Sequence, residues 1–322
     1  MAEVVIVMGP QASGKTSFML ENFPNHFRIN RDTIGGKLDK LDVYLDNALS
    51  MGAKQIVLDN TYKTRDSRKT VIDTAKKHGA NVTCFWLTTT IADCQVNACL
   101  RMMERHGKIL SPEETKEAGK KDSNMFPIAA LYNYFSKVPS KQMEPPTRGE
   151  GFAHVITVGF VRKWGAEYVN RGVILDYDDT IRCVSKDSDC TTKYPTKPEH
   201  VKILPNRRTV LDRWLEKGYS LFGASNQSGI SKGVLTEVEA RACFQKTNEL
   251  LGLPILVNYC PHTASPTTCY CRKPCPGLLI DHIFKNKLDP KEVIFVGDQT
   301  SDRTAAARLG IKYLHESEFF KI

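Results

Sequence analysis

The sequence predicts an α/β protein of two domains, each a parallel sheet with flanking helices, over residues 1–165 and 166–322. Length favours two domains, because single domains average roughly 150 residues and the chain has 322. Strand-like runs alternate with helix-like segments in two successive rounds. In each round, an early apolar run leads directly into a polar motif of the phosphate-handling type. Such alternation is typical of parallel sheets wrapped by helices.

The first round contains four short runs rich in β-branched and aromatic residues, separated by longer helix-like segments. The runs are Val4–Met8, Gln55–Leu58, Val82–Leu87 and His154–Val158. Ser111 predicts a helix start, because a serine cap is followed by Glu114 at the third helical position.

The second round begins with a strand that ends just before Asp176 and continues to the end of the chain. The predicted elements are a helix over 206–217, a strand over 219–224, a helix over 236–251, a helix from Pro276, a strand over 293–296 and a helix after Ser301. We expect this half to be Rossmann-like.

Composition favours a soluble protein of the cytoplasm or nucleus without membrane contact. No apolar run approaches the roughly 18 residues of a membrane span, and Met1–Glu3 lacks the start of a signal peptide. The formal charge is +9, with a larger excess in residues 1–165, which suits either a polyanion partner or a mixed-sign surface. The 10 cysteines are expected as thiols or metal ligands, not as disulfides.

A complete phosphate-binding loop follows the first apolar run and precedes a predicted helix. Its residues are Gly9, Pro10, Gln11, Ala12, Ser13, Gly14, Lys15 and Thr16. The backbone N–H groups of such a loop wrap phosphates, the lysine reaches the terminal phosphates, and the hydroxyl ligates Mg²⁺. The pattern predicts ATP and Mg²⁺ as cofactors.

An acceptor site needs a base, and two acidic residues follow the next strands. Asp32 could accept the proton of an attacking hydroxyl, and Asp59 could orient the site or hold the metal through water. Arg101 and Arg105 are four residues apart on a predicted helix and could close over the transferred phosphate, or form a solvated helix face.

These segments resemble the kinase domain of the polynucleotide kinase/3'-phosphatase family. The likeness rests on residues 29–35, 58–61, 67–68 and 150–152 and covers most of residues 1–165. It implies that Asp32 is the general base toward a 5'-hydroxyl and that Arg68 positions acceptor phosphates. It also implies a lid arginine, for which Arg105 is the prediction and Arg101 the alternative.

Four segments of the second half resemble the haloacid dehalogenase superfamily in residue type and order. They are Asp176 to Thr180 with Asp176 and Asp178, Ser225 to Gly229 with Ser225 and Asn226, Lys273, and Gly297-Asp298 with Asp302. The chemistry explains each type, because one carboxylate attacks phosphorus and a second protonates the leaving oxygen. The predicted nucleophile is therefore Asp176 and the predicted acid is Asp178.

The remaining residues of these segments would bind phosphate, substrate or metal. Ser225 and Lys273 are expected to bind phosphate oxygens, and Asn226 to contact the substrate. Asp176, Asp178 and Asp298 are the candidate Mg²⁺ ligands. The chain departs from many relatives at Asp179, which stands where they have glycine.

A cysteine-rich loop precedes Lys273 and predicts a structural Zn²⁺ site. The candidate ligands are Cys260, His262, Cys269 and Cys271, with Cys275 as an alternative to His262. Three thiolates and one imidazole so close together can complete a tetrahedral site. The loop resembles zinc-loop phosphatases that act on heptose bisphosphate and histidinol phosphate.

Taken together, the two resemblances imply an enzyme that phosphorylates 5'-hydroxyl ends and removes 3'-phosphates from DNA or RNA. A ligase is then the candidate partner downstream. The alternatives are a metabolic kinase/phosphatase of sugar phosphates or nucleotides, favoured by the zinc loop, and a non-catalytic adaptor, disfavoured because every expected catalytic residue is present.

Overall fold

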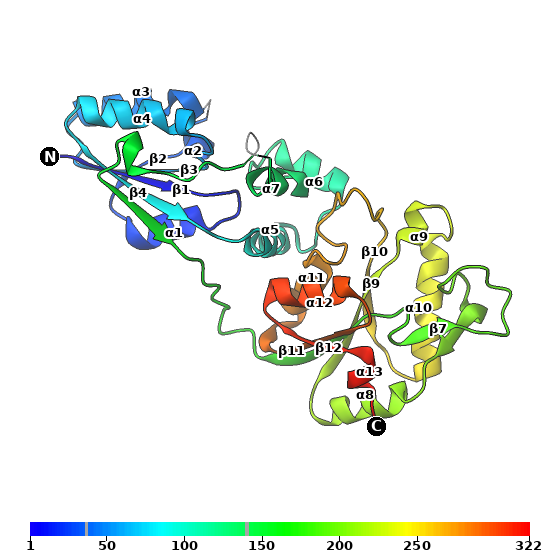
Figure 1. The fold of residues 1–322 in the computed structure, drawn as a ribbon. Helices are drawn as coiled ribbons and strands as arrows, with labels where there is room; N and C mark the ends of the chain where they lie inside the picture. Colours follow the sequence, from blue (N-terminus) through cyan, green and yellow to red (C-terminus); the bar gives the residue numbers. More distant parts are fainter. Residues whose placement is uncertain (36–37, 139–141) are drawn as a thin grey trace. The chain divides into compact units, whose positions relative to one another are not determined.

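The computed structural model describes residues 1–35, 38–138 and 142–322 (Figure 1). Its contacts divide the chain into two compact units. The first unit comprises Met1–Ala98 and Lys116–Arg162, and the second comprises Cys99–Thr115 and Lys163–Ile322. Each unit contains a five-stranded parallel sheet with helices, which confirms the predicted fold class.

The sheet of the first unit has the strand order β2-β3-β1-β4-β5. Its strands are β1 (Glu3–Met8), β2 (Phe27–Ile29), β3 (Gln55–Asn60), β4 (Asn81–Leu87) and β5 (His154–Val158). All neighbouring strands pair in parallel. The four predicted strands are therefore present, and β2 is the short strand expected just before Asn30.

Alternate residues of the central strand β1 enter two different cores. Val4, Ile6 and Met8 pack under α3 (Leu41–Ser50) and α4 (Arg65–Lys77). Val5 and Val7 pack on the other face with Met19 of α1 (Lys15–Asn22). Figure 1 shows α3 and α4 on one side of this sheet and α1 on the other. Such burial on both faces explains the continuous apolar run of a parallel strand.

Four further helices belong to the first half of the chain: α2 (Arg31–Ile34), α5 (Ile91–His106), α6 (Pro112–Gly119) and α7 (Ile128–Tyr134). Helix α6 begins as predicted, because the Ser111 hydroxyl accepts a hydrogen bond from the Glu114 backbone N–H at 3.1 Å. In return, the Glu114 carboxylate accepts from the Ser111 N–H at 2.9 Å. This is the reciprocal capping expected from the sequence.

The sheet of the second unit has the strand order β10-β9-β6-β11-β12. Its strands are β6 (Asn170–Leu175), β9 (Ser220–Asn226), β10 (Leu256–Cys260), β11 (Leu288–Gly297) and β12 (Lys312–His315). A separate antiparallel hairpin, β7 (Arg182–Val184) and β8 (Val201–Ile203), lies between β6 and β9 in the chain. The sequence analysis missed this hairpin and the edge strands β10 and β12.

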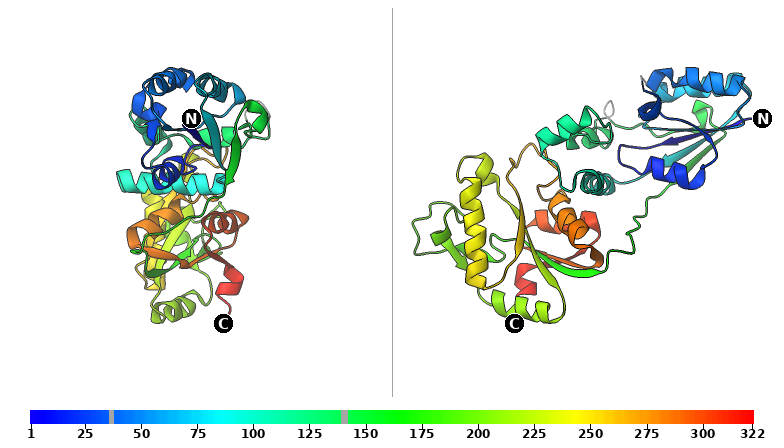
Figure 2. Two further views of the ribbon diagram at one scale, coloured as in Figure 1. Left: turned by 90° about the vertical axis from the view of Figure 1, so that its left-hand side faces the viewer. Right: turned by 180° about the vertical axis from the view of Figure 1, so that it is seen from behind.

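Helices cover both faces of this second sheet, as the two further views in Figure 2 show. The helices are α8 (Arg207–Glu216), α9 (Ser228–Ser231), α10 (Glu237–Leu251), α11 (Gly277–Asn286), α12 (Thr300–Leu309) and α13 (Glu316–Phe319). Val173 and Leu175 of β6 share one core with residues of α8, α10 and α13. Short 3-10 turns occur at Leu38–Lys40, Arg148–Glu150 and Pro198–His200.

No helix within the described residues is both long enough and apolar enough to span a membrane.

Candidate active sites

The loop after β1 forms a compact turn at the carboxyl edge of the first sheet. Ala12 and Gly14 both adopt positive φ angles, 58° and 89°, and α1 begins directly afterwards at Lys15. A side chain at Gly9 would meet the Ser13 hydroxyl at 2.7 Å. The Ser13 hydroxyl is buried and has no hydrogen-bond partner in the structure. The loop is thus a tight cradle of backbone groups that suits phosphate oxygens.

The side chain of Lys15, the lysine of this loop, turns back onto the backbone of the loop. The Lys15 ammonium donates to the backbone oxygens of Gly9 at 3.0 Å and Pro10 at 2.7 Å. These contacts keep a positive charge at the cradle, where the terminal phosphates of a nucleoside triphosphate are expected.

Thr16, at the start of α1, meets an acidic residue from the neighbouring strand. Its hydroxyl donates to Oδ2 of Asp59 at 3.1 Å. Arg28 of β2 holds the same carboxylate with two hydrogen bonds, from Nε to Oδ1 at 2.9 Å and from Nη2 to Oδ2 at 2.8 Å. A hydroxyl and a carboxylate side by side at a phosphate loop are oxygen donors that fit Mg²⁺.

The predicted base lies one strand further along the same edge. Asn30 caps α2 by accepting hydrogen bonds from the backbone N–H groups of Asp32 and Thr33, and its amide donates to Oδ1 of Asp59 at 3.0 Å. Asp32 itself keeps a carboxylate that is 42% exposed and lies 3.1 Å from Arg31. Asn30 therefore links the exposed Asp32 to the Thr16–Asp59 pair.

The structure corrects the prediction that Arg68 positions acceptor phosphates. The Arg68 side chain is 0% exposed and forms a two-bond ion pair with Glu150, at 2.7 and 3.0 Å. Its remaining nitrogen donates to the backbone oxygens of Tyr62 and Glu144 at 3.0 Å each. A guanidinium with all these partners inside the protein has a structural role, fastening α4 to the segment before β5.

The two candidate lid arginines both lie on α5. Arg101 is half-buried and Arg105 is exposed. The choice between them stays a prediction.

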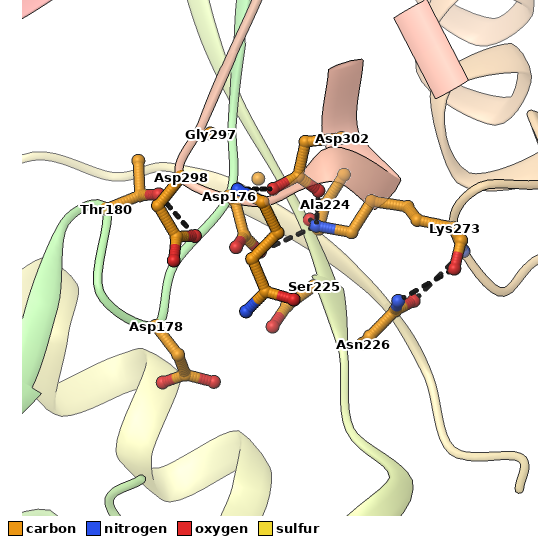
Figure 3. A network of polar contacts seen from close by, with 12 residues as sticks. Asp176, Asp178, Thr180, Ala224, Ser225, Asn226, Lys273, Gly297, Asp298 and Asp302 are labelled. Carbon is orange, nitrogen blue, oxygen red and sulfur yellow. Dashed lines mark hydrogen bonds and ion pairs between the residues drawn. The ribbon is translucent and has the colours of Figure 1, made fainter. Parts of the chain in front are cut away.

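In the second unit, the predicted phosphatase residues converge at the carboxyl ends of β6, β9 and β11. Lys273, only 3% exposed, donates from its ammonium to Oδ1 of Asp176 at 2.7 Å and to the Ala224 oxygen at 2.7 Å. It also lies 2.8 Å from the Asp302 carboxylate. Figure 3 shows these side chains pointing toward one another.

Three carboxylates form a candidate cation site in this cluster. One oxygen from each of Asp176, Asp298 and Asp302 lies within 4.8 Å of the others. Burial raises the pKa of Asp176 to about 7, with Asp302 adding to the effect and Lys273 opposing it. Such crowding of carboxylates is relieved by a divalent cation, and oxygen donors suit Mg²⁺.

Asp178 does not join this cluster. Its side chain is directed away from Asp176 and Asp302 in Figure 3, and its carboxylate contacts Arg182 and Gln227 instead. The structure therefore places Asp302, and not the Asp178 carboxylate, with the other two candidate Mg²⁺ ligands.

The last two residues of β9, Ser225 and Asn226, take different positions. Ser225 is buried at the end of the strand. The Asn226 amide nitrogen donates to the Lys273 backbone oxygen at 3.0 Å, and its oxygen accepts from the Lys273 N–H at 3.0 Å. Both ends of this amide thus hold the Lys273 backbone, and contact of Asn226 with the substrate stays a prediction.

Asp179, where many relatives have glycine, occupies a left-handed conformation with φ of 61°. Aspartate tolerates this region better than most residues. Its carboxylate lies 3.1 Å from the Lys193 ammonium, which belongs to the long loop of the β7–β8 hairpin.

The predicted zinc ligands form one cluster between β10 and α11. The ligand atoms of Cys260, His262, Cys269 and Cys271 all lie within 4.8 Å of one another. The sulfurs of Cys260 and Cys269 are 3.7 Å apart, and Nδ1 of His262 lies 3.4 and 3.2 Å from the sulfurs of Cys260 and Cys271. Tetrahedral zinc with bonds of about 2.3 Å requires sulfurs about 3.8 Å apart, so the four residues fit Zn²⁺.

The alternative ligand Cys275 is not in this cluster. Its sulfur instead accepts a hydrogen bond from Arg308 at 3.8 Å. Within the described part of the chain, His262 is thus the fourth member of the group.

The sequence analysis missed three residues that support the sites, namely Arg28, Arg182 and Gln227. Each holds a predicted aspartate through side-chain hydrogen bonds. Arg28 lies 31 positions from its partner, so no local spacing could have revealed it. Gln227 lies within the Ser225–Gly229 segment that was already recognised as part of the phosphatase site. Its place in this motif was the signal that could have found it.

Comparison with known proteins concerns mainly the second unit. Residues 188–315 match the family described as haloacid dehalogenase-like hydrolase. The D-glycero-beta-D-manno-heptose-1,7-bisphosphate 7-phosphatase of Bordetella bronchiseptica is 31% identical over 142 residues, which cover 43% of this chain and 75% of that protein. The D-glycero-alpha-D-manno-heptose-1,7-bisphosphate 7-phosphatase of Campylobacter jejuni is 31% identical over 140 residues, covering 40% of this chain and 80% of that protein.

Solved structures similar to parts of the chain include proteins of two kinds. The heptose bisphosphate phosphatase of B. bronchiseptica, complexed with magnesium and phosphate, is 28% identical and covers 44% of this chain and 78% of its own, with a TM-score of 0.39. A gluconokinase from Sinorhizobium meliloti is 16% identical and covers 50% of this chain and 84% of its own, with a TM-score of 0.32. On the match of residues 188–315 and on these similar relatives, the chain belongs to the haloacid dehalogenase-like hydrolase family.

Proposed function

We propose that this protein heals nucleic-acid ends, phosphorylating 5'-hydroxyl ends with ATP and removing 3'-phosphates. The observation that carries the proposal is the presence of two complete phosphate-handling sites in one chain. In the first unit, the phosphate loop ends in Lys15 and Thr16, and the Thr16 hydroxyl meets Asp59. In the second unit, Lys273 contacts both Asp176 and Asp302. Both reactions make a broken strand ligatable, which supplies a reason for their fusion.

In the kinase reaction, the loop N–H groups and Lys15 bind the triphosphate, and Thr16 and Asp59 would hold Mg²⁺. A cation held there would neutralise charge on the transferred phosphate. Asp32, whose carboxylate is exposed, accepts the proton of the 5'-hydroxyl as its oxygen attacks phosphorus. An exposed base is accessible to the end of a long polymer.

In the phosphatase reaction, Asp176 attacks the phosphorus of the 3'-phosphate and Asp178 protonates the departing 3'-oxygen. Lys273 and Ser225 bind phosphate oxygens. Asp176, Asp298 and Asp302 would hold Mg²⁺, which offsets the negative charge of phosphate and nucleophile. The zinc cluster lies directly before Lys273 in the chain and stabilises the loop that carries this lysine.

Two features favour a polymer substrate over a small metabolite. Only the small β7–β8 hairpin and its loop separate Thr180 from α8 in the chain, where an inserted domain could have enclosed the site. The basic excess of residues 1–165 suits a polyanion, since several phosphates must be neutralised.

A metabolic phosphatase is the second candidate. It is favoured by the relatives that act on heptose bisphosphate and by the cysteine-histidine cluster in the second unit. In this function the phosphatase needs one phosphate pocket, and its activity is insensitive to the length of the substrate.

One comparison separates the two candidates. Labelled ATP is offered with a 5'-hydroxyl oligonucleotide, free nucleosides and sugars, and phosphate release is measured from 3'-phosphorylated DNA and RNA, heptose bisphosphate and histidinol phosphate. End healing predicts a preference of at least about 100-fold in kcat/KM for oligonucleotides, falling steeply with salt. Equal or better turnover of the small phosphate esters supports the metabolic function and contradicts ours.

A further inference from the structure

Both oxygens of the Asp178 carboxylate are held by side chains that lie outside the carboxylate cluster. Nε of Arg182 donates to Oδ1 at 2.8 Å, and Nε2 of Gln227 donates to Oδ2 at 2.7 Å. The Asp178 side chain is only 9% exposed. Its orientation is therefore set by these two neighbours and not by solvent.

Arg182 is itself fixed on every side. Its side chain is 1% exposed, its Nη1 donates to the Thr247 hydroxyl at 3.1 Å, and its guanidinium carbon lies 4.7 Å from the ring centre of Phe244. Thr247 and Phe244 both belong to α10, so this helix holds the arginine. The Tyr177 ring packs on it as well, at 5.5 Å.

Gln227 connects the carboxylate to the phosphate side of the site. The same Nε2 that donates to Asp178 also donates to the Ser225 hydroxyl at 2.9 Å. Gln227 is 6% exposed and Ser225 is 1% exposed. The acid and the phosphate-binding hydroxyl thus share one amide donor.

We propose that Arg182 and Gln227 are positioning residues that orient Asp178 for proton transfer, with Gln227 tying that orientation to occupancy of Ser225. The inference rests on the proposed phosphatase function. A phosphate oxygen that engages Ser225 changes the partners of the Gln227 amide, which frees Oδ2 of Asp178 to face the ester oxygen. Arg182 keeps hold of Oδ1 throughout.

Asp178 is needed in both half-reactions. In the first, Asp176 bonds to phosphorus, the ester P–O bond breaks with its electron pair on oxygen, and that oxygen takes the proton of Asp178. In the second, water attacks phosphorus and gives its proton to Asp178. The bond to Asp176 then breaks, restoring its carboxylate and releasing inorganic phosphate.

Removing Arg182 leaves the nearly buried Asp178 carboxylate without its cation, which costs stability whether Arg182 is structural or positions Asp178. The two roles therefore differ in kinetics more than in stability. If Arg182 is only structural, its loss should slow the reaction of every substrate by the same factor. If Arg182 positions Asp178, its loss should slow most the steps that need proton transfer. A leaving group as stable as nitrophenolate needs no proton in the first step, but an alkyl oxygen does.

The test uses the full-length protein with Arg182→Met, Arg182→Lys and Gln227→Leu, assayed on nitrophenyl phosphate and on a simple alkyl phosphate. With nitrophenyl phosphate, we expect a rapid burst of about one nitrophenolate per chain followed by slow turnover, because phosphorylation of Asp176 proceeds while water activation fails. With the alkyl ester, the first step itself falls by about 100-fold. Arg182→Lys should recover part of this loss.

Arg208→Met is the matched control, since Arg208 is an exposed arginine paired with Asp212 on α8, and it should match the wild type. Equal losses on both substrates without a burst, in Gln227→Leu as well as Arg182→Met, overturn the positioning role. Wild-type protein that hydrolyses neither of these esters nor a 3'-phosphorylated oligonucleotide, with Asp176→Asn indistinguishable from it, overturns the phosphatase function itself.

Discussion

Lys273 holds the Asp176 carboxylate at 2.7 Å inside the second unit, where both side chains are nearly inaccessible to solvent. Burial disfavours the charged form of Asp176, and the ammonium offsets part of that penalty. The same ammonium lies 2.8 Å from Asp302. The lysine therefore keeps two crowded carboxylates together at the place where a phosphate and a cation are expected.

Asp176→Asn should abolish the phosphatase and leave the kinase intact, because an amide cannot form the covalent phosphoryl intermediate. We expect a loss of at least about 1000-fold in phosphate release, with ATP-dependent transfer unchanged. Lys15→Met should have the opposite effect, measured in the same two assays. Substantial phosphatase turnover by Asp176→Asn is incompatible with a covalent mechanism.

Purified protein should contain about one zinc per chain, as measured by elemental analysis. Cys269→Ser should lose the ion and lower the melting temperature, because a structural zinc contributes folding energy directly. Cys275→Ser is the matched control, since the Cys275 sulfur contacts Arg308 and lies outside the cluster. Zinc retained in Cys269→Ser but lost in Cys275→Ser would assign the ligands differently.

Arg68→Met should destabilise the first unit by about 3–5 kcal/mol, because it leaves the nearly buried Glu150 carboxylate without its positively charged partner. Chemical denaturation would measure the change. Adding Glu150→Gln should recover part of it, as the uncompensated charge is then removed. If Arg68→Met instead left stability unchanged and weakened oligonucleotide binding, the phosphate-binding role that the sequence implied would be restored.

Because of His282, we expect the protein to lose stability as the pH becomes acidic. Burial lowers the pKa of this histidine to about 4, and its Nε2 lies 2.8 Å from the Gly223 oxygen. Below its ordinary value of 6.5, the unfolded chain binds a proton that the folded chain does not. The free energy of unfolding should therefore decrease as the pH falls from 6.5 toward 4, by about 1.4 kcal/mol per pH unit at most.

His282→Gln should flatten this part of the pH dependence, as measured by denaturant unfolding at several pH values. His106→Gln is the control, because His106 is exposed and should leave the slope unchanged. An identical acid slope in His282→Gln and the wild type would show that other groups determine it.

The sequence revealed the parts of the fold that depend on local pattern. Apolar runs such as Val4–Met8 are central strands buried on both faces, so their composition alone marks them. The missed strands Arg182–Val184 and Val201–Ile203 have three residues each. Strands so short carry no periodicity.

For the two sites as well, local sequence pattern predicted some features and missed those that depend on residues far apart in the chain. Motifs predicted which residues converge, because strands in parallel sheets bring their carboxyl ends to one edge. Motifs did not predict how neighbours orient each side chain. Arg68 and Arg182 carry the same chemistry in sequence, and only their burial against Glu150 and Asp178 shows that they serve as internal partners.

Arg28 should tune the metal affinity of the kinase site without taking part in the reaction. It holds both oxygens of Asp59, and Asp59 accepts the hydrogen bond from Thr16. Removing a partner that orients a metal-binding carboxylate commonly weakens metal binding by about 10- to 100-fold. We expect Arg28→Gln to raise the Mg²⁺ concentration for half-maximal kinase activity by about that factor. Turnover at saturating Mg²⁺ should stay near the wild-type value.

Lys77→Gln provides the comparison for Arg28→Gln, because Lys77 is a 74% exposed cation that pairs with Asp46 at the surface. Its Mg²⁺ titration should overlay that of the wild type. The second site offers an internal reference, since the phosphatase of Arg28→Gln should require the same Mg²⁺ as before. A loss of kinase turnover that added Mg²⁺ does not restore would mean that Arg28 acts on the substrates and not through Asp59.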